Sequence, residues 1–137
     1  MTPRHSRWIL AIAILAAGCA APSPDRQLFA TASALTKLSS SVEATVLFRN
    51  PPPTASDAEL LRLSTADNPE LLRSFEPFTL RVLRHAQGVI VLVCDRAGRT
   101  ALLEDASCTA RLDRHHWRDA AGSPCDFTLK MPEVCAP

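Results

Sequence analysis

Hydrophobic residues recur at two different spacings in the first half of the chain, and each spacing predicts a type of element. Intervals of three or four residues separate the apolar positions Leu28, Ala32, Leu35 and Leu38. This spacing predicts a helix over 24–39, which begins at the capping sequence Ser23-Pro24 and is expected to end at three consecutive serines. Over 42–49 apolar and polar residues alternate instead, which predicts a half-buried strand.

After three prolines at 51–53, the pattern predicts two short helices and a set of strands. Ser56 and Glu59 form a capping box for a helix over 56–64, and Asn68-Pro69 begins a helix over 68–75. Further strands are expected over 78–84, 89–94, 100–104 and 125–131. The strand at 89–94 is apolar throughout, which predicts a central strand that is covered on both faces. Segment 111–121 is ambiguous and is compatible with one helix.

Together these elements predict an α+β fold: a small antiparallel sheet of about 4–5 strands, with helices packed on one face. Residues 24–137 are few enough for a single domain with one core. The chain is 47% hydrophobic and 21% charged, which excludes general disorder. Its formal charge is +1, or −1 without Arg4 and Arg7, so we expect no nucleic acid among its partners.

The first 19 residues carry the pattern of an export signal. Arg4 and Arg7 make the start basic, and 8–17 is an apolar run too short to span a bilayer. It leads into the sequence LAAGC at 15–19, which resembles the lipobox of bacterial lipoproteins. In that class Leu is more common than Ala at the position of Ala16.

The resemblance implies that residues 1–18 are a cleaved signal peptide. Cys19 is then the lipidated N-terminus and starts a short tether over 19–23, so the membrane is a partner through the lipid anchor. Neither Ala20 nor Ala21 is the aspartate that usually retains such proteins in the inner membrane of enterobacteria. An outer-membrane protein that faces the periplasm is therefore expected. The alternative is an ordinary secretory signal cleaved near Ala20 or Ala21.

Four cysteines remain beyond the anchor: Cys94, Cys108, Cys125 and Cys135. An even number in an exported chain predicts two disulfides. A hairpin formed by 89–94 and 100–104 would place Cys94 and Cys108 about 15 Å apart or more, which excludes a bond between them. Two pairings survive: Cys94–Cys125 with Cys108–Cys135, or Cys108–Cys125 with Cys94–Cys135. The second is favoured because Cys108 and Cys125 bracket the ambiguous segment and Cys135 would tie the chain's end to the sheet.

Other chemistry-bearing residues form no convincing site. The richest polar cluster contains Cys108, Asp113, His115, His116 and Trp117. Its two adjacent histidines would point to different sides of a helix or a strand, so no metal is expected. Another group, Asp95, Glu104 and Asp105, lacks the spacing of a calcium loop and is interpreted as solvated turn charges. No serine lies in a G-x-S-x-G or S-x-x-K motif, and we expect no enzymatic activity and no cofactor.

The sequence therefore predicts a small membrane-anchored envelope lipoprotein with a disulfide-bonded periplasmic domain. Without a catalytic motif, that domain is expected to bind another envelope protein, as an accessory subunit of a cell-envelope assembly. The alternative is a ligand-binding or inhibitor lipoprotein of the periplasm.

Overall fold

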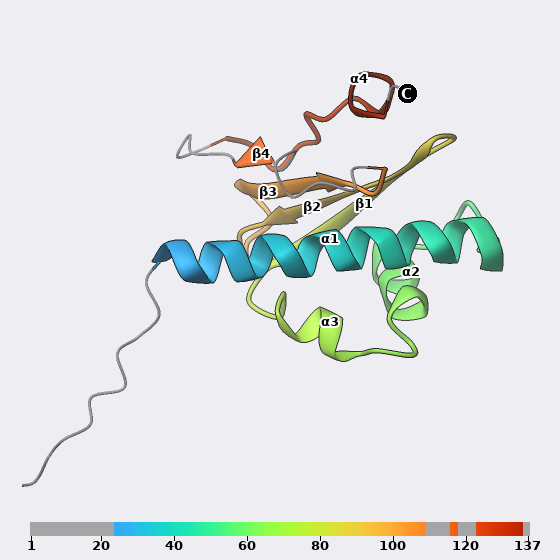
Figure 1. Cartoon of the computed structure of the whole chain (residues 1–137), viewed down its shortest axis with the longest axis horizontal. Coiled ribbons are helices and arrows are strands. Elements are labelled where there is room, and N and C mark those ends of the chain that lie inside the picture. Colours follow the sequence, from blue (N-terminus) through green and yellow to red (C-terminus); the bar gives the residue numbers. More distant parts are fainter. Residues whose placement is uncertain (1–23, 109–115, 118–122, 136–137) are drawn as a thin grey trace, which may run out of the picture.

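The computed structural model describes residues 24–108, 116–117 and 123–135 of the chain. Three layers follow one another: helices, an antiparallel sheet, and the C-terminal segment 123–135 on the other side of the sheet (Figure 1). The elements in chain order are α1 (Pro24–Arg49), α2 (Asp57–Ser64), α3 (Glu70–Arg73), β1 (Thr79–His85), β2 (Gly88–Cys94), β3 (Ala101–Ala106), β4 (His116–Trp117) and α4 (Met131–Val134). The predicted α+β class is confirmed. The expected count of about 4–5 strands is too high, because three strands form the body of the sheet and β4 adds only two residues.

Residues 42–49 continue α1 and do not form the predicted strand. The residues that α1 buries recur every three or four positions: Ala32, Leu35, Leu38, Ser39, Val42 and Thr45. The helical spacing of the first half thus extends through 42–49, and packing against the sheet overrides the alternating pattern. The helix leaves Leu47 64% and Phe48 85% exposed.

The serine run does not end α1, because its hydroxyl groups bond to acceptors within the helix or on the elements packed against it. Ser40 donates to the carbonyl oxygen of Thr36 at 2.9 Å, within α1, whereas Ser41 donates to the carbonyl oxygen of Ser64 on α2. Helix α1 ends at Arg49, ten residues beyond the predicted end at 39. There Asn50 adopts the left-handed conformation with φ of 45°, and the prolines at 51–53 follow.

The two short helices begin close to where the sequence predicts. Ser56 caps α2 by accepting a hydrogen bond from the backbone N–H of Glu59 at 3.2 Å, as the capping box requires. Leu60 and Leu61 on α2 are buried in the core. Helix α3 is one turn long and therefore shorter than the predicted 68–75.

The strands form an antiparallel meander in the order β1-β2-β3-β4. His85 pairs with Gly88 at the tip of the β1–β2 hairpin. The predicted turn after β2 is confirmed: the Gly98 N–H donates to the Asp95 carbonyl oxygen at 2.9 Å, and Gly98 has a φ of 65°. Segment 111–121 lies outside the described residues except for 116–117, and there the compatible helix is wrong, because these two residues pair with β3.

Strand β2 is buried along its whole length, as predicted for a central strand. Its residues on one face join α1 and α2 in the main core: Val89, Val91 and Val93. Its residues on the other face pack against the C-terminal segment: Ile90, Leu92 and Cys94. Helices α1 to α3 therefore cover one face, as expected, while the C-terminal segment with α4 covers the other.

The predicted strand over 125–131 is wrong. The Cys125 N–H still donates to the Arg99 carbonyl oxygen at 2.9 Å, beside an isolated bridge between Thr100 and Pro124. Beyond this point the segment leaves the edge of β3 and crosses the face of the sheet as irregular chain until α4 begins.

Two disulfides connect Cys94 with Cys125 and Cys108 with Cys135, with Cα–Cα distances of 5.8 and 5.6 Å. The expectation of two disulfides is confirmed, whereas the favoured pairing, Cys108–Cys125 with Cys94–Cys135, is wrong. Its error follows from the path of the C-terminal segment, which starts beside Cys94 and ends beyond the far end of β3, where Cys108 lies.

Candidate functional site

The face of the sheet away from α1 carries the features of a binding site, because the C-terminal segment covers it only in part. Arg81 on β1 fastens the start of this segment. Its guanidinium group donates to the Cys125 carbonyl oxygen, lies 3.6 Å from a carboxylate oxygen of Asp126 and sits 5.2 Å from the centre of the Phe127 ring. Three contacts from one side chain thus fix where the segment begins its crossing.

Glu104 holds the middle of the same segment. Its carboxylate is fully buried and accepts hydrogen bonds from the backbone N–H groups of Thr128 and Leu129, at 2.8 and 3.1 Å, and from the Thr128 hydroxyl at 2.7 Å. These bonds take the place of a strand ladder, which explains why the segment can run as irregular chain over a buried surface. The interpretation of Glu104 as a solvated turn charge is therefore wrong.

Asp105, the next residue, is also fully buried but points to the helical layer, because successive side chains of a strand alternate between faces. The Ser39 hydroxyl of α1 donates a hydrogen bond to its carboxylate. Asp105 was also expected to be solvated, and this expectation is wrong because its side chain is buried. The adjacent carboxylates thus connect β3 to α1 on one face and to the C-terminal segment on the other.

Asp95, the third acid of the expected group, does lie in a turn. Its carboxylate accepts hydrogen bonds from the backbone N–H groups of Arg99 and Thr100, at 2.7 and 3.2 Å. These bonds hold the pKa of the Asp95 carboxyl below its usual value. The group of three acids does not converge on one point, since two of them serve the core and one shapes a turn.

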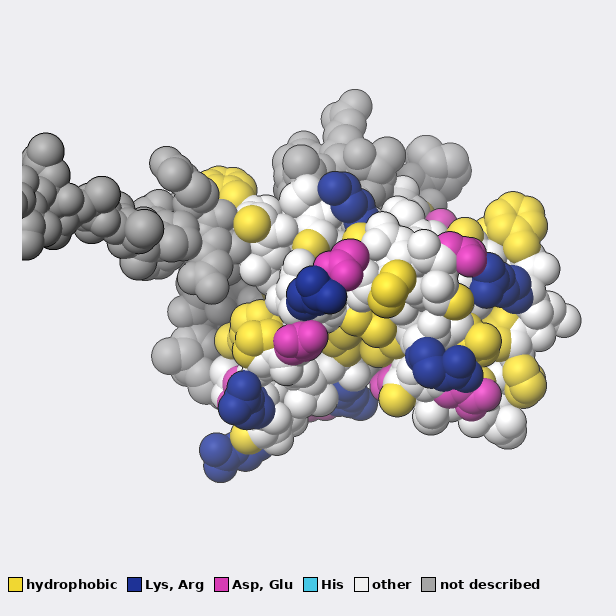
Figure 2. All heavy atoms as spheres, turned by 90° about the horizontal axis from the view of Figure 1, so that it is seen from below, with side chains coloured by type: hydrophobic (Ala, Val, Ile, Leu, Met, Phe, Trp, Pro, Cys, Tyr) yellow, Lys and Arg dark blue, Asp and Glu magenta, His cyan; other side chains and the backbone are white. Residues whose placement is uncertain are grey.

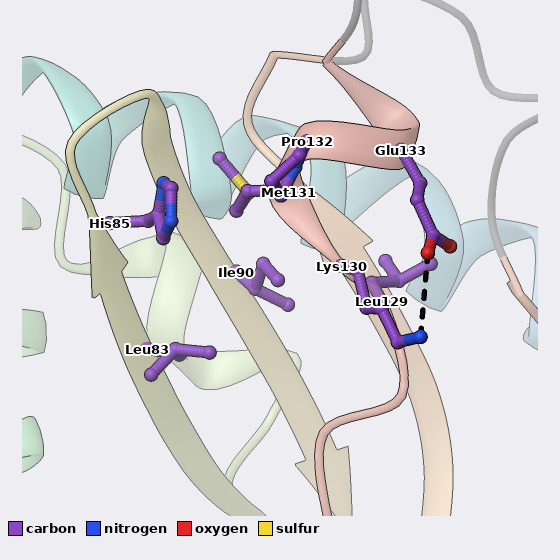
Figure 3. A pocket seen from close by; sticks show the side chains of 8 residues that line it. All are labelled: Leu83, His85, Ile90, Leu129, Lys130, Met131, Pro132 and Glu133. Atoms are coloured by element: carbon purple, nitrogen blue, oxygen red, sulfur yellow. Dashed lines mark ion pairs between the residues drawn. The ribbon is translucent and has the colours of Figure 1, made fainter.

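A groove of about 370 Å³ remains between β1 and the end of the C-terminal segment (Figure 3). Its lining comes from β1, β2 and the segment around α4: Leu83, His85, Ile90, Leu129, Lys130, Met131, Pro132 and Glu133. The floor is apolar, and Leu83 is 39% exposed although it lies directly across from buried Ile90 in the sheet. At the rim, Lys130 and Glu133 form an ion pair with a distance of 3.4 Å.

The groove borders the outer edge of β1, and the register shows which backbone groups lie there. The Val89 carbonyl oxygen accepts a hydrogen bond from Ser107 on the β3 side, so the even-numbered residues of β2 direct their backbone groups to β1. Counting across the β1–β2 pairing then leaves Leu80, Val82 and Arg84 with backbone groups that point outward. In the described part of the chain no strand pairs with this edge.

A second hollow of similar size, about 360 Å³, lies between α1 and α3. It is lined mainly by small or polar residues: Ala30, Ser33, Ala34, Lys37, Asn68, Glu70, Leu71 and Ser74. Figure 2 shows the molecule from the side of these helices, and there basic and acidic side chains are interspersed among apolar ones. The groove beside β1 is the stronger candidate, because only there does an apolar floor adjoin an unpaired strand edge.

The structure places the other predicted site residues as follows. Cys19, the expected lipidation site, lies outside the described residues, as do Asp113 and His115. Cys108 is bonded to Cys135, and the backbone of His116 pairs with Glu104 across β3 and β4. Among the described residues no three His, Cys, Asp or Glu side chains form a group that could hold a metal ion.

The groove was not predicted from the sequence, although β1 carries one signal for it. Arg81, Leu83 and His85 share one face of β1 by strand alternation, and Leu83 is the apolar member of that polar set.

Comparisons of the chain with protein-family models, with curated proteins and with solved structures found no match. Within the described residues, no helix combines the length and apolar character needed to cross a membrane.

Proposed function

We propose that this protein is a lipid-anchored component of a bacterial cell envelope, whose disulfide-bonded domain binds another envelope protein as an accessory subunit of an assembly. The sequence LAAGC at 15–19 carries the proposal, since it resembles a lipobox and stands just ahead of α1, which begins at Pro24. An attached pair or triplet of acyl chains would hold the domain firmly at the membrane surface. The absence of aspartate at positions 20 and 21 favours the outer membrane, with the domain in the periplasm.

Two observations support this environment and role. The disulfides Cys94–Cys125 and Cys108–Cys135 suit an oxidising compartment such as the periplasm. The unpaired edge of β1 and the adjoining groove offer a surface for a partner. We propose no enzymatic activity, because the buried acids Glu104 and Asp105 act as structural acceptors of hydrogen bonds.

The first test concerns the anchor. Replacing Cys19 with Ala should leave an unprocessed precursor that incorporates no labelled palmitate, because the thiol is the acyl acceptor. Ser23→Ala is the matched control: it lies in the tether, leaves residues 15–19 intact and should be processed and labelled like the wild type. If the Cys19→Ala protein is still cut and labelled, residues 15–19 are not a lipobox.

The second test concerns the partner. A photo-reactive amino acid is placed in turn at the large apolar residues that the described surface exposes: Phe29, Leu47, Phe48 and Leu83. In intact cells at least one position should form a discrete adduct with an envelope protein, because protein-binding surfaces commonly include large apolar side chains that are exposed in the unbound protein. The adduct should be absent from the Cys19→Ala variant. Adducts at none of the four positions would contradict a protein-binding function.

A second candidate function is a lipoprotein that binds a small apolar molecule or inhibits a lytic enzyme. The groove favours the small-molecule form, because its volume of about 370 Å³ is within the size range of ligand pockets.

A further inference from the structure

We infer that the outer edge of β1 and its groove bind an extended segment of the partner protein, which joins the sheet as an additional strand and carries an apolar residue directly next to an acidic one. This inference rests on the proposed protein-binding function and specifies the chemistry of the partner. Three observations carry it: the unpaired backbone, the apolar groove on one face of β1, and the basic group on the other.

The backbone at the edge of β1 selects an extended chain. Leu80, Val82 and Arg84 direct their N–H and C=O groups outward, and no backbone group of the described residues bonds to them. A row of such groups along a strand is a template for another strand, and the hydrogen bonds it forms do not depend on the partner's side chains. A compact apolar molecule would form no hydrogen bonds with these groups.

The groove selects an apolar side chain at one position of that strand. In a sheet, residues directly opposite one another project their side chains to the same face. The partner residue opposite Leu83 would therefore project to the face of the groove and pack against Leu83, which lines the groove together with Ile90, Leu129 and Met131. Figure 3 shows Leu83 on β1 at one side of the groove and Pro132 and Glu133 of α4 at the other, so a strand added at the edge of β1 would lie on the side away from α4.

The face of β1 opposite the groove favours an acidic residue in the partner, next to its apolar residue. Arg84 projects there, and its guanidinium group donates to the carbonyl oxygens of Pro52 at 2.9 Å and Ala55 at 3.4 Å. Among the described carboxylates, none forms an ion pair with Arg84. Residues next to the apolar one lie on this face, and opposite charges across a strand pair are favourable. The expected pattern is therefore an apolar residue with an acidic residue directly next to it, opposite Arg84.

The experiment uses the full chain, produced in a bacterium with its own export signal and purified in detergent. A library of random linear peptides displayed on phage is selected against it, and the strongest peptide is synthesised. We expect selected peptides in which an apolar residue lies directly next to an acidic one. The bound peptide should slow amide hydrogen exchange at Leu80, Val82 and Arg84, read by NMR, because these N–H groups become hydrogen-bonded.

Matched variants then locate the binding site. Leu83→Glu should weaken peptide binding about ten-fold or more, equivalent to about 1.4 kcal/mol, because it places a charge in the groove. Leu47→Glu makes the same change at an exposed leucine of α1 and should change the affinity by less than about two-fold, since it lies on another element. Leu83→Ser provides a milder variant, and circular dichroism verifies that each protein is folded.

Several outcomes would overturn the inference. The inference is wrong if no peptide is selected, if the bound peptide leaves amide exchange along β1 unchanged, or if Leu83→Glu and Leu47→Glu weaken peptide binding equally. It is also wrong if a second copy of the chain alone protects the amides of β1, or if the groove binds a small apolar molecule and no peptide. The cross-linking experiment separates this failure from that of the proposed function. Adducts at Phe29 or Leu47 but none at Leu83 would retain a protein partner and place it on a different surface.

Discussion

Removal of either disulfide should lower the free energy of unfolding by about 3–4 kcal/mol, and removal of both should leave little folded protein. The bonded cysteines are 31 and 27 residues apart in sequence, and closing loops of that length restricts the unfolded chain by this amount in the chain-entropy description. The combined loss is comparable with the total stability of many domains, about 5–15 kcal/mol. Chemical denaturation of the paired alanine variants provides the measurement.

The two pairs serve as controls for each other. Cys94 is fully buried and Cys125 nearly so, whereas Cys108 is exposed, so the loss of Cys94–Cys125 should cost more than the loss of Cys108–Cys135. Peptide mapping without reduction tests the connectivity directly. A peptide that joins Cys108 to Cys125, or equal stability with and without a reducing agent, would contradict this account.

Local sequence signals predicted the elements that local interactions determine. The capping box at Ser56 and Glu59, the turn at Asp95 and Gly98, and the continuous apolar run of β2 each specify structure within a few residues. The C-terminal half of α1 fits both patterns, because over 42–49 the same residues satisfy alternation and helical spacing. Only the sheet beneath the helix decides between them, and a sequence window does not contain it.

The path of the C-terminal segment could not be predicted for a related reason. Residues 125–131 have the composition of a strand, but their backbone groups bond to side chains far away in sequence, Glu104 and Arg81. The favoured disulfide pairing was wrong as well, because the path of this segment determines where Cys125 and Cys135 lie. The predicted exclusion of a Cys94–Cys108 bond is confirmed, since these two cysteines lie at opposite ends of the β2–β3 hairpin and each is bonded to another cysteine.

The groove depends on this same path, because Leu129 and Met131 reach it only when the C-terminal segment crosses the sheet. Glu104 is therefore connected to the proposed binding surface although it does not line it. A variant that loosens the segment around Thr128 should alter the groove without disturbing α1 on the opposite face.

Glu104→Ala should lower the free energy of unfolding by about 3–5 kcal/mol, because it leaves the N–H group of Thr128 and the buried N–H group of Leu129 without their acceptor and opens a cavity. Glu104→Gln should cost about 1–3 kcal/mol, because the amide keeps the volume but replaces one acceptor oxygen with a donor. Denaturant unfolding measures both. The matched control is Glu70→Gln, which removes an exposed ion pair to Arg73 and should change stability by about 0.5 kcal/mol or less.

A double-mutant cycle tests whether Glu104 acts through the C-terminal segment. Thr128→Val removes the hydroxyl that donates to Glu104 at 2.7 Å, and combined with Glu104→Gln it should show a coupling energy of about 0.5–3 kcal/mol. Amide exchange should accelerate at Thr128 and Leu129 in the Glu104→Gln protein, while the buried turns of α1 around Leu35 and Leu38 keep their protection. Additive effects, or an equal acceleration in α1, would mean that Glu104 stabilises the domain as a whole and does not specifically hold the segment that forms the groove.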